Sequence, residues 1–449
     1  MHSTNRFDRI LAEDACRESS ALARAVRQSL PAVRVEPSAI RSVAVRVAGP
    51  VLVSFVLWVL ARARDAGIER LYFLSRDGEV MLDVANALPR ELTAGLELRR
   101  LEVSRSAVSV PAASLIGVDC WIDAGTRPGG FLVHQRERVS AATLIGRAGL
   151  DIGADVASMG LAAADLVEPF SDGGFRHWLK YLASDEAQER ILGESQARLR
   201  PVVDYFIQER LGAPQRSALV DVGWTGQQAA MLSVIIEHVG GSVPVHLHVG
   251  RLRDAPTMVD IDLRTWLFDD RTGHRTLENP VALFETFCAT ELGGVTNYET
   301  RAGQVVALRR HSPHEAALKL WGLNEMRDGI IDFASSFRLD GEDGDSEDPD
   351  SDLQPVALEL LEAFWHAPTS EEAQAWGSFP YERDEQGKVI QTLAVRYDRR
   401  WLSQRFDKDF HGIDWPAGSI AISSPLVRRV FALRRWLRTL LASATKPAL

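Results

Sequence analysis

Two short segments carry residue types that can bind a phosphorylated ligand. The first is Ser75-Arg76-Asp77-Gly78, which directly follows the apolar run Leu71-Tyr72-Phe73-Leu74. The planar guanidinium of Arg76 can pair with a phosphate. Asp77 can serve as an acid, a base or a metal ligand, and Gly78 permits a tight turn. The alternative is an ordinary surface turn in which Arg76 pairs with Asp77.

The second segment, Asp221 to Gln228, follows the apolar run Ala218-Leu219-Val220 and leads into a helical pattern. Gly223 and Gly226 allow the backbone to approach a ligand closely. Because a helix is expected to begin at Thr225 to Gln227, backbone N–H groups there can hold an anion. The alternative is a tight turn without a ligand.

Side chains around these loops extend the predicted site. Asp221 can accept hydrogen bonds from sugar hydroxyls or hold a metal, and otherwise only caps the next helix. Trp224 can stack on a base or a sugar. Arg105 is a second phosphate candidate, with an ordinary salt bridge as its alternative. Glu285 is an acid among apolar residues and a candidate base, although an amphipathic helix explains its position nearly as well.

The loops follow strand-like runs that are apolar on both faces, which predicts a parallel sheet covered by helices on both sides. Such sheets bind ligands at the carboxyl ends of their strands. We therefore expect an α/β fold with a Rossmann-like, mainly parallel sheet, a helical insertion and a mostly helical C-terminal region. The expected units are an N-terminal helical segment (1–45), a first α/β unit (46–125), a helical insertion or cap (126–200), a second α/β unit (201–300) and the C-terminal region (301–449).

Composition is that of a soluble globular protein, with 46% apolar and 25% charged residues among 449. The net charge of −10 argues against nucleic acid as a partner. Residues 340–352 hold eight of the acidic side chains and predict an acidic loop. Three dispersed cysteines and an N-terminus without an apolar signal core predict a cytoplasmic location. The apolar run 47–61 is shorter than a membrane span and predicts a buried helix.

The segment 425–442 predicts an amphipathic helix. Leu426, Val430, Leu433 and Leu437 fall on one face at helical spacing, while arginines such as Arg428 lie on the other. A basic amphipathic helix can rest on an anionic membrane surface, which would place the protein at the inner face of the membrane. The alternative is a helix that docks on its own domain.

As a set, several motifs resemble a bacterial family of predicted hydrolases of the haloacid dehalogenase superfamily, which is associated with surface-polysaccharide biosynthesis. These motifs are Tyr72 to Gly78, Ser104-Arg105, Asp221 to Gly226, Glu285 to Gly294 and Trp415 to Gly418. The superfamily begins with a strand ending in Asp-x-Asp, whose first aspartate is the nucleophile. That position is Ser75 here, without an evident activating base, so the sequence does not support aspartyl-phosphate chemistry.

A second resemblance is to phosphoribosyltransferases. The segment Asp221 to Gln228 is similar to their diphosphate-sugar loop, with Val220 in place of one of two acids and Gln227-Gln228 in place of Gly-Thr. This resemblance implies that the loop Ser75 to Glu79 takes pyrophosphate.

The sequence therefore predicts an enzyme of bacterial surface-glycan biosynthesis that transfers a glycosyl or phosphoryl group from a phosphorylated or nucleotide-activated sugar. Mg²⁺, held by Asp77 and Asp221, is the expected metal. One alternative is a haloacid-dehalogenase-like phosphohydrolase or a phosphoribosyltransferase-like enzyme. Another is a non-catalytic scaffold that recruits a glycosyltransferase to the membrane through residues 425–442.

Overall fold

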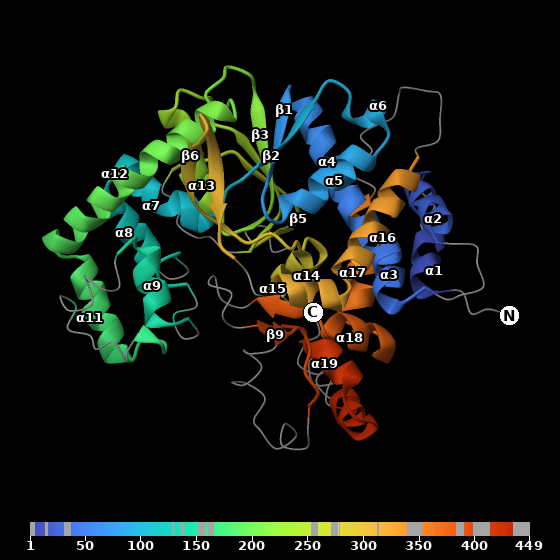
Figure 1. Ribbon diagram of the computed structural model, residues 1–449. Helices are drawn as coiled ribbons and strands as arrows, with labels where there is room; N and C mark the ends of the chain where they lie inside the picture. The colour runs from blue at the N-terminus through green and yellow to red at the C-terminus, as the bar shows by residue number, and fades with distance from the viewer. Residues whose placement is uncertain are drawn as a thin grey trace, which may run out of the picture.

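The computed structural model confirms an α/β fold in which helices cover both faces of a parallel sheet (Figure 1). The structure describes residues 5–13, 17–30, 37–127, 130–134, 136, 139–150, 159, 166–252, 259–270, 277, 279–311, 314–338, 353–382, 390–397 and 414–433. The predicted acidic loop 340–352 and residues 434–442 of the predicted C-terminal helix lie outside these ranges.

The sheet has five parallel strands in the order β2-β1-β3-β4-β5. The strands are β1 (Arg70–Leu74), β2 (Glu97–Leu101), β3 (Ser217–Trp224), β4 (Val245–Arg251) and β5 (Leu263–Asp269). The chain runs outward from β1 to β2 in one direction and from β3 to β5 in the other. The strand order therefore reverses between β1 and β3, and doubly wound sheets bind ligands at that point.

Alternate side chains of β1 enter two separate cores, as expected for a strand buried on both faces. Leu71 and Phe73 belong to the first core, and Tyr72 and Leu74 to the second. The first core is covered chiefly by α4 (Gly49–Asp65), α5 (Gly78–Ala87), α14 (Pro280–Phe287), α16 (Leu323–Ser336) and α17 (Leu353–Trp365). The second is covered by α7 (Arg105–Ile116), α12 (Asp185–Gln208) and α13 (Gln227–His238).

The segment between β2 and β3 is helical, as the sequence predicts for residues 126–200. Its other helices are α8 (Val118–Thr126), α9 (Ala141–Arg147) and α11 (Asp172–Leu182). Figure 1 shows these three helices with α7 and α12 on one side of the molecule, beside the sheet. The hairpin of β6 (Val295–Arg301) and β7 (Gln304–Arg309) contacts α12, and the Tyr298 hydroxyl donates to the Glu102 carbonyl at 2.7 Å.

The C-terminal region is mostly helical, and the first core extends into it. Its further elements are α15 (His314–Trp321), α18 (Ser370–Gly377), α19 (Pro416–Ile422) and a hairpin of β8 (Pro380–Glu382) and β9 (Ile390–Thr392). The sequence analysis foresaw neither this hairpin nor that of β6 and β7. Both are two-stranded and antiparallel, and their strands show little of the apolar alternation by which a strand is recognised in sequence.

The N-terminal segment forms α1 (Arg6–Glu13), α2 (Arg17–Ser29) and α3 (Ala39–Val43), and a short helix, α6 (Arg90–Thr93), precedes β2. The first two helices pack into the core, because Phe7 and Leu22 are fully buried. A π-helical turn, η1 (Ala44–Ala48), joins α3 to α4. The whole helix 39–65 is long and apolar enough to cross a membrane by length and composition, but 94% of its apolar window is buried inside the protein. It has the burial of a core helix, as predicted for residues 47–61.

Candidate functional site

The two predicted loops lie side by side at the carboxyl edge of the sheet, on either side of the point where the strand order reverses. Strands β1 and β3 are hydrogen-bonded neighbours whose register runs to the pair Phe73–Val220. Asp221 therefore follows directly on the last paired residue, and Ser75 to Gly78 follow the end of β1. Two segments that are far apart in sequence are thus brought to neighbouring positions at one edge of the sheet.

The turn after β1 is fixed by close backbone packing. The Ser75 N–H donates to the Leu101 carbonyl at 3.0 Å, and its buried hydroxyl donates to the Val103 carbonyl at 3.3 Å. A side chain at Gly78 would lie 2.8 Å from the Phe73 backbone, so helix α5 can begin this close to the strand only with glycine. Because its hydroxyl is engaged, Ser75 is poorly placed to act as a nucleophile.

Strand β3 continues past Asp221 to Trp224, three residues further than the sequence analysis expected. Gly223 adopts a φ of +100°, and a Cβ there would lie 2.5 Å from the Gly250 carbonyl oxygen. Trp224 itself has a φ of +106°, which is strained for a residue with a side chain. Gly226, with a φ of +73°, then begins α13. Asp221 does not cap that helix, because its carboxylate accepts from the Val222 N–H at 2.9 Å.

Three half-buried carboxylates meet at this edge: Asp77, Asp221 and Glu285. Burial and then the charge of Asp221 raise the pKa of Asp77 to about 7, against the attraction of Arg76. Burial also raises the pKa of Asp221 to about 7, although the Val222 N–H and Arg105 lower it. For Glu285, burial and the charge of Asp77 raise the pKa to about 7.

Burial is the largest cause of all three shifts, and repulsion by a neighbouring carboxylate adds to it. Strongly perturbed carboxyl groups that converge from separate elements are enriched at functional sites, where burial and charged neighbours shift pKa values. The buried thiol of Cys288 borders the cluster: burial and the charges of Asp77 and Asp221 raise the pKa of Cys288 well above its usual value.

Two arginines predicted from sequence lie at this edge. Arg105 is the first residue of α7 and lowers the pKa of both Asp221 and Glu285 by its charge. Arg76 does not simply pair with Asp77. Its Nη1 donates to Glu382 at 2.8 Å, and Arg310 donates to the other oxygen of the same carboxylate at 2.8 Å. Two guanidinium groups therefore converge on one anion.

The sequence analysis missed Tyr381, Glu382 and Arg310. The Tyr381 hydroxyl donates to the Glu285 carboxylate, and the Glu382 side chain is only 7% exposed. Both residues belong to β8, so the C-terminal region supplies direct contacts to this site. They carry no local motif, and they reach Arg76 and Glu285 across 306 and 96 residues of sequence.

The structure corrects the role predicted for Trp224. Its indole is 8% exposed and packs in the first core, with its ring centre 6.1 Å from that of Phe284. Its position on β3 turns it toward the core face of the sheet, so it offers no free stacking surface. Thr225 is half-buried, whereas Gln227 is 2% exposed. Within the described chain the Gln227 side-chain nitrogen has no hydrogen-bond partner, which leaves a donor at the start of α13.

No three His, Cys, Asp or Glu side chains in the described ranges are arranged to hold a metal ion by themselves. A Mg²⁺ ion, however, is commonly held by one or two carboxylates together with water and ligand phosphates. Asp77 and Asp221 would be the two carboxylates of such a site, because the charge of Asp221 reaches Asp77 and raises its pKa.

His246 and His248 alternate on β4 and are buried. Burial lowers the pKa of His248 to about 3 and that of His246 well below its usual value. The His246 ring nitrogen lies 2.8 Å from the Ser233 hydroxyl. Both rings are therefore neutral packing groups.

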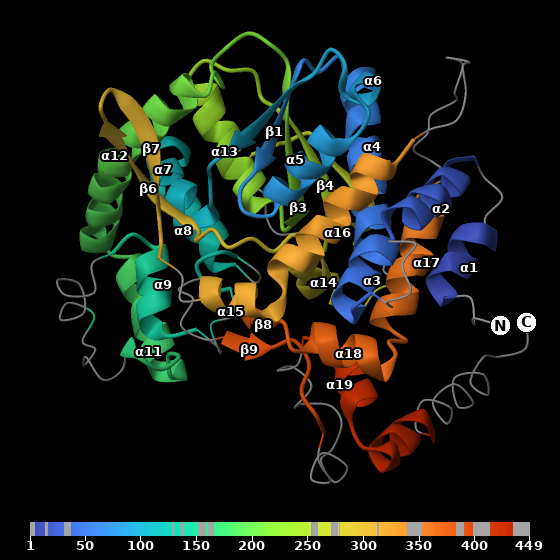
Figure 2. The same cartoon turned by 45° about the vertical axis from the view of Figure 1, so that its right-hand side comes forward.

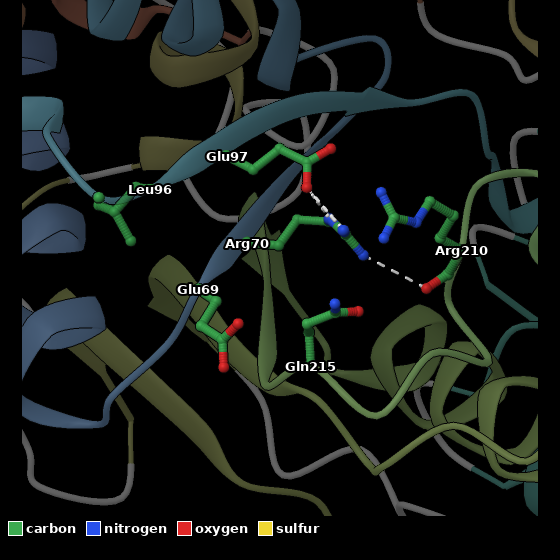
Figure 3. A pocket seen from close by; sticks show the side chains of 7 residues that line it. Glu69, Arg70, Leu96, Glu97, Arg210 and Gln215 are labelled. Atoms are coloured by element: carbon green, nitrogen blue, oxygen red, sulfur yellow. Dashed lines mark hydrogen bonds and ion pairs between the residues drawn. The ribbon is translucent and has the colours of Figure 1, made fainter.

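A pocket of about 410 Å³ lies at the opposite, amino edge of the sheet, beside the first residues of β1 and β2. Figure 3 shows the side chains that line it. It is lined by Glu69, Arg70, Gly95, Leu96, Glu97, Arg210 and Gln215. Its charges are matched, because Arg70 donates to Glu97 at 2.7 Å. The carboxyl edge is the stronger candidate, because there the carboxylates raise one another's pKa values beside two arginines that converge on the Glu382 carboxylate.

No family model matches the chain, and no curated protein matches it significantly.

Proposed function

We propose that the protein is an enzyme that transfers a glycosyl or phosphoryl group from a phosphorylated or nucleotide-linked sugar. The observation that carries the proposal is the convergence of Asp77, Asp221 and Glu285 beside Arg76, at the edge where doubly wound sheets bind ligands. From the motif resemblance, we also propose that the enzyme acts in bacterial surface-glycan biosynthesis.

The anion-binding half of the site consists of Arg76, Arg310 and the start of α13. The Glu382 carboxylate accepts hydrogen bonds from both guanidinium groups. The position of this carboxylate therefore suits a phosphate that takes its place. N–H groups at the start of α13 add further donors. Asp77 and Asp221 would hold Mg²⁺ against the same phosphates, and the ion would offset charge that develops on the leaving group.

The proton-transfer half is Glu285. Its pKa of about 7 allows it to accept a proton near neutral pH, and the Tyr381 hydroxyl holds its carboxylate in place. In the transfer, the acceptor hydroxyl gives its proton to Glu285 while its oxygen forms a bond to the sugar carbon or the phosphorus. The bond to the leaving phosphate oxygen breaks, and that oxygen keeps the electron pair beside Arg76.

Direct transfer is favoured over hydrolysis through a covalent phosphoenzyme. The residue in the nucleophile position, Ser75, is 7% exposed and donates its hydroxyl to the Val103 carbonyl. No side chain in the described ranges is seen to activate it as a base would. The haloacid-dehalogenase-like alternative would require this hydroxyl to leave its present partner.

The test is phosphorus NMR of the protein with Mg²⁺, a panel of nucleotide sugars and sugar phosphates, and mixed sugar acceptors. Transfer should release a phosphate or nucleotide product, and Glu285→Gln should lower turnover about 100-fold or more while ligand binding persists. The control is Glu291→Gln, a partly exposed acid whose carboxylate pairs with Lys319 at 2.9 Å, and it should leave turnover unchanged. If no member of the panel binds or turns over, the proposal is wrong.

A further inference from the structure

The helix that follows α19 docks on the protein by one side only. Residues 425–433 are helical, and Val427 is 1% exposed. The Phe431 ring stacks on the buried Tyr397 ring, with 5.4 Å between their centres. Val427 and Phe431 are four residues apart, so they share the side of the helix that faces the body.

A different side of this helix presents leucines to solvent. Leu426 and Leu433 are 51% and 56% exposed, and seven residues, or two turns, separate them. They lie roughly 100° around the helix from Val427. In the sequence, Leu437, Leu440 and Leu441 continue the same spacing. The docked-helix interpretation therefore does not account for the leucine side of this segment.

The charge of the segment is opposite to that of the chain as a whole. Residues 415–449 contain five arginines, one lysine and no acid, whereas the whole chain has a net charge of −10. Arg428 and Arg429 are exposed beside the leucines. An exposed leucine stripe bordered by cations matches the surface of an anionic bilayer, where the apolar groups enter and the cations meet lipid headgroups.

We propose that the helix beginning at Pro425 binds the surface of an anionic lipid bilayer. Leu426 and Leu433 enter the headgroup region, and Arg428 and Arg429 contact lipid phosphates. Figure 2 shows α19 and this helix at the end of the molecule away from the sheet. The bilayer therefore contacts the C-terminal region and leaves the sheet and its helices in solution. This inference does not depend on the proposed reaction.

The test is co-sedimentation of the full chain with vesicles of phosphatidylcholine, alone or in an equimolar mixture with phosphatidylglycerol. The wild-type protein should bind only the anionic vesicles, and less as salt rises. Each arginine lost in Arg428→Gln/Arg429→Gln should weaken binding about fivefold. Leu426→Ser/Leu433→Ser should weaken it at least about tenfold. The control is Leu320→Ser, an 89% exposed leucine on α15, which should bind as wild type.

Three results would overturn the proposal. One is failure of the wild-type protein to bind anionic vesicles. Another is unchanged binding by the leucine pair variant, with thermal melting showing that it remains folded. The third is that the leucine side binds a second copy of the chain instead of lipid. Light scattering without lipid would then show that the wild-type protein is a dimer and that the Leu426→Ser/Leu433→Ser variant is a monomer.

Discussion

Replacing Asp77 by asparagine should make the protein more stable at about pH 8, although it removes a proposed ligand-binding group. Burial and Asp221 raise the pKa of Asp77 from 3.8 to about 7, so at pH 8 the folded state carries a carboxylate that it disfavours. A shift of this size corresponds to about 4 kcal/mol at most. Because the side chain is half-buried and solvent screens the repulsion, we expect a gain of about 1–2 kcal/mol.

The sign of the pH dependence follows from linkage. The folded-state pKa lies above the unfolded value, so the folded state binds more protons between pH 3.8 and about 7, and stability is lost as pH rises through that window. Asparagine does not ionise, so the advantage of Asp77→Asn should be largest at pH 8 and should nearly vanish at about pH 4.

Urea unfolding of both proteins at the two pH values, with EDTA present, measures this difference. The control is Asp83→Asn on α5, the helix that follows Asp77, where the Asp83 carboxylate receives a hydrogen bond from Arg327 at 2.6 Å. Removal of that favourable partner should not stabilise the protein. The reasoning is refuted if Asp77→Asn is no more stable than wild type at pH 8, or if its gain is the same at both pH values.

Three further predictions concern the surroundings of the site. Glu382→Gln should free Arg76 and Arg310 and raise pyrophosphate affinity about three- to tenfold by calorimetry; equal or weaker affinity in the folded variant would contradict this. Gly223→Ala should cost about 2–4 kcal/mol in urea unfolding, because its φ is +100° and its Cβ would meet the Gly250 carbonyl, whereas the control Gly193→Ala, with nothing within 4 Å, should be neutral or stabilising. In urea unfolding, wild type should lose about 2 kcal/mol more stability than His248→Gln when the pH falls from 7 to 5. The reason is that the folded-state pKa of His248, about 3, lies below its unfolded value of 6.5, so stability is lost as pH falls below 6.5. Equal losses in the two proteins would argue that His248 is not held neutral.

The sheet and two loops could be predicted because their signals are local. Leu71 to Leu74 and Ala218 to Val220 are continuous apolar runs, and such runs specify strands buried on both faces. The polar, glycine-bearing turns that follow each run mark the carboxyl edge of the sheet. Strand neighbours then follow from the general behaviour of doubly wound sheets.

The remaining parts of the site depend on contacts that no local pattern records. Glu382 and Tyr381 come from a three-residue strand, and its position beside Arg76 depends on how the C-terminal region packs. The wrong prediction of a stacking role for Trp224 has a related cause. The strand continues past Asp221 through residues with positive φ, and this backbone path sets the direction of the indole. Sequence spacing alone does not reveal that path.

The most direct measurement of the central claim is a double-mutant cycle for pyrophosphate binding in the presence of Mg²⁺. Calorimetry would compare wild type, Arg76→Gln, Asp221→Asn and the double variant, each checked for native folding. If both loops form one site, each single variant should lose about tenfold or more in affinity, and the double variant should lose less than the sum of the two free-energy changes. Wild-type affinity in both single variants, or strictly additive losses, would contradict a shared site at the carboxyl edge.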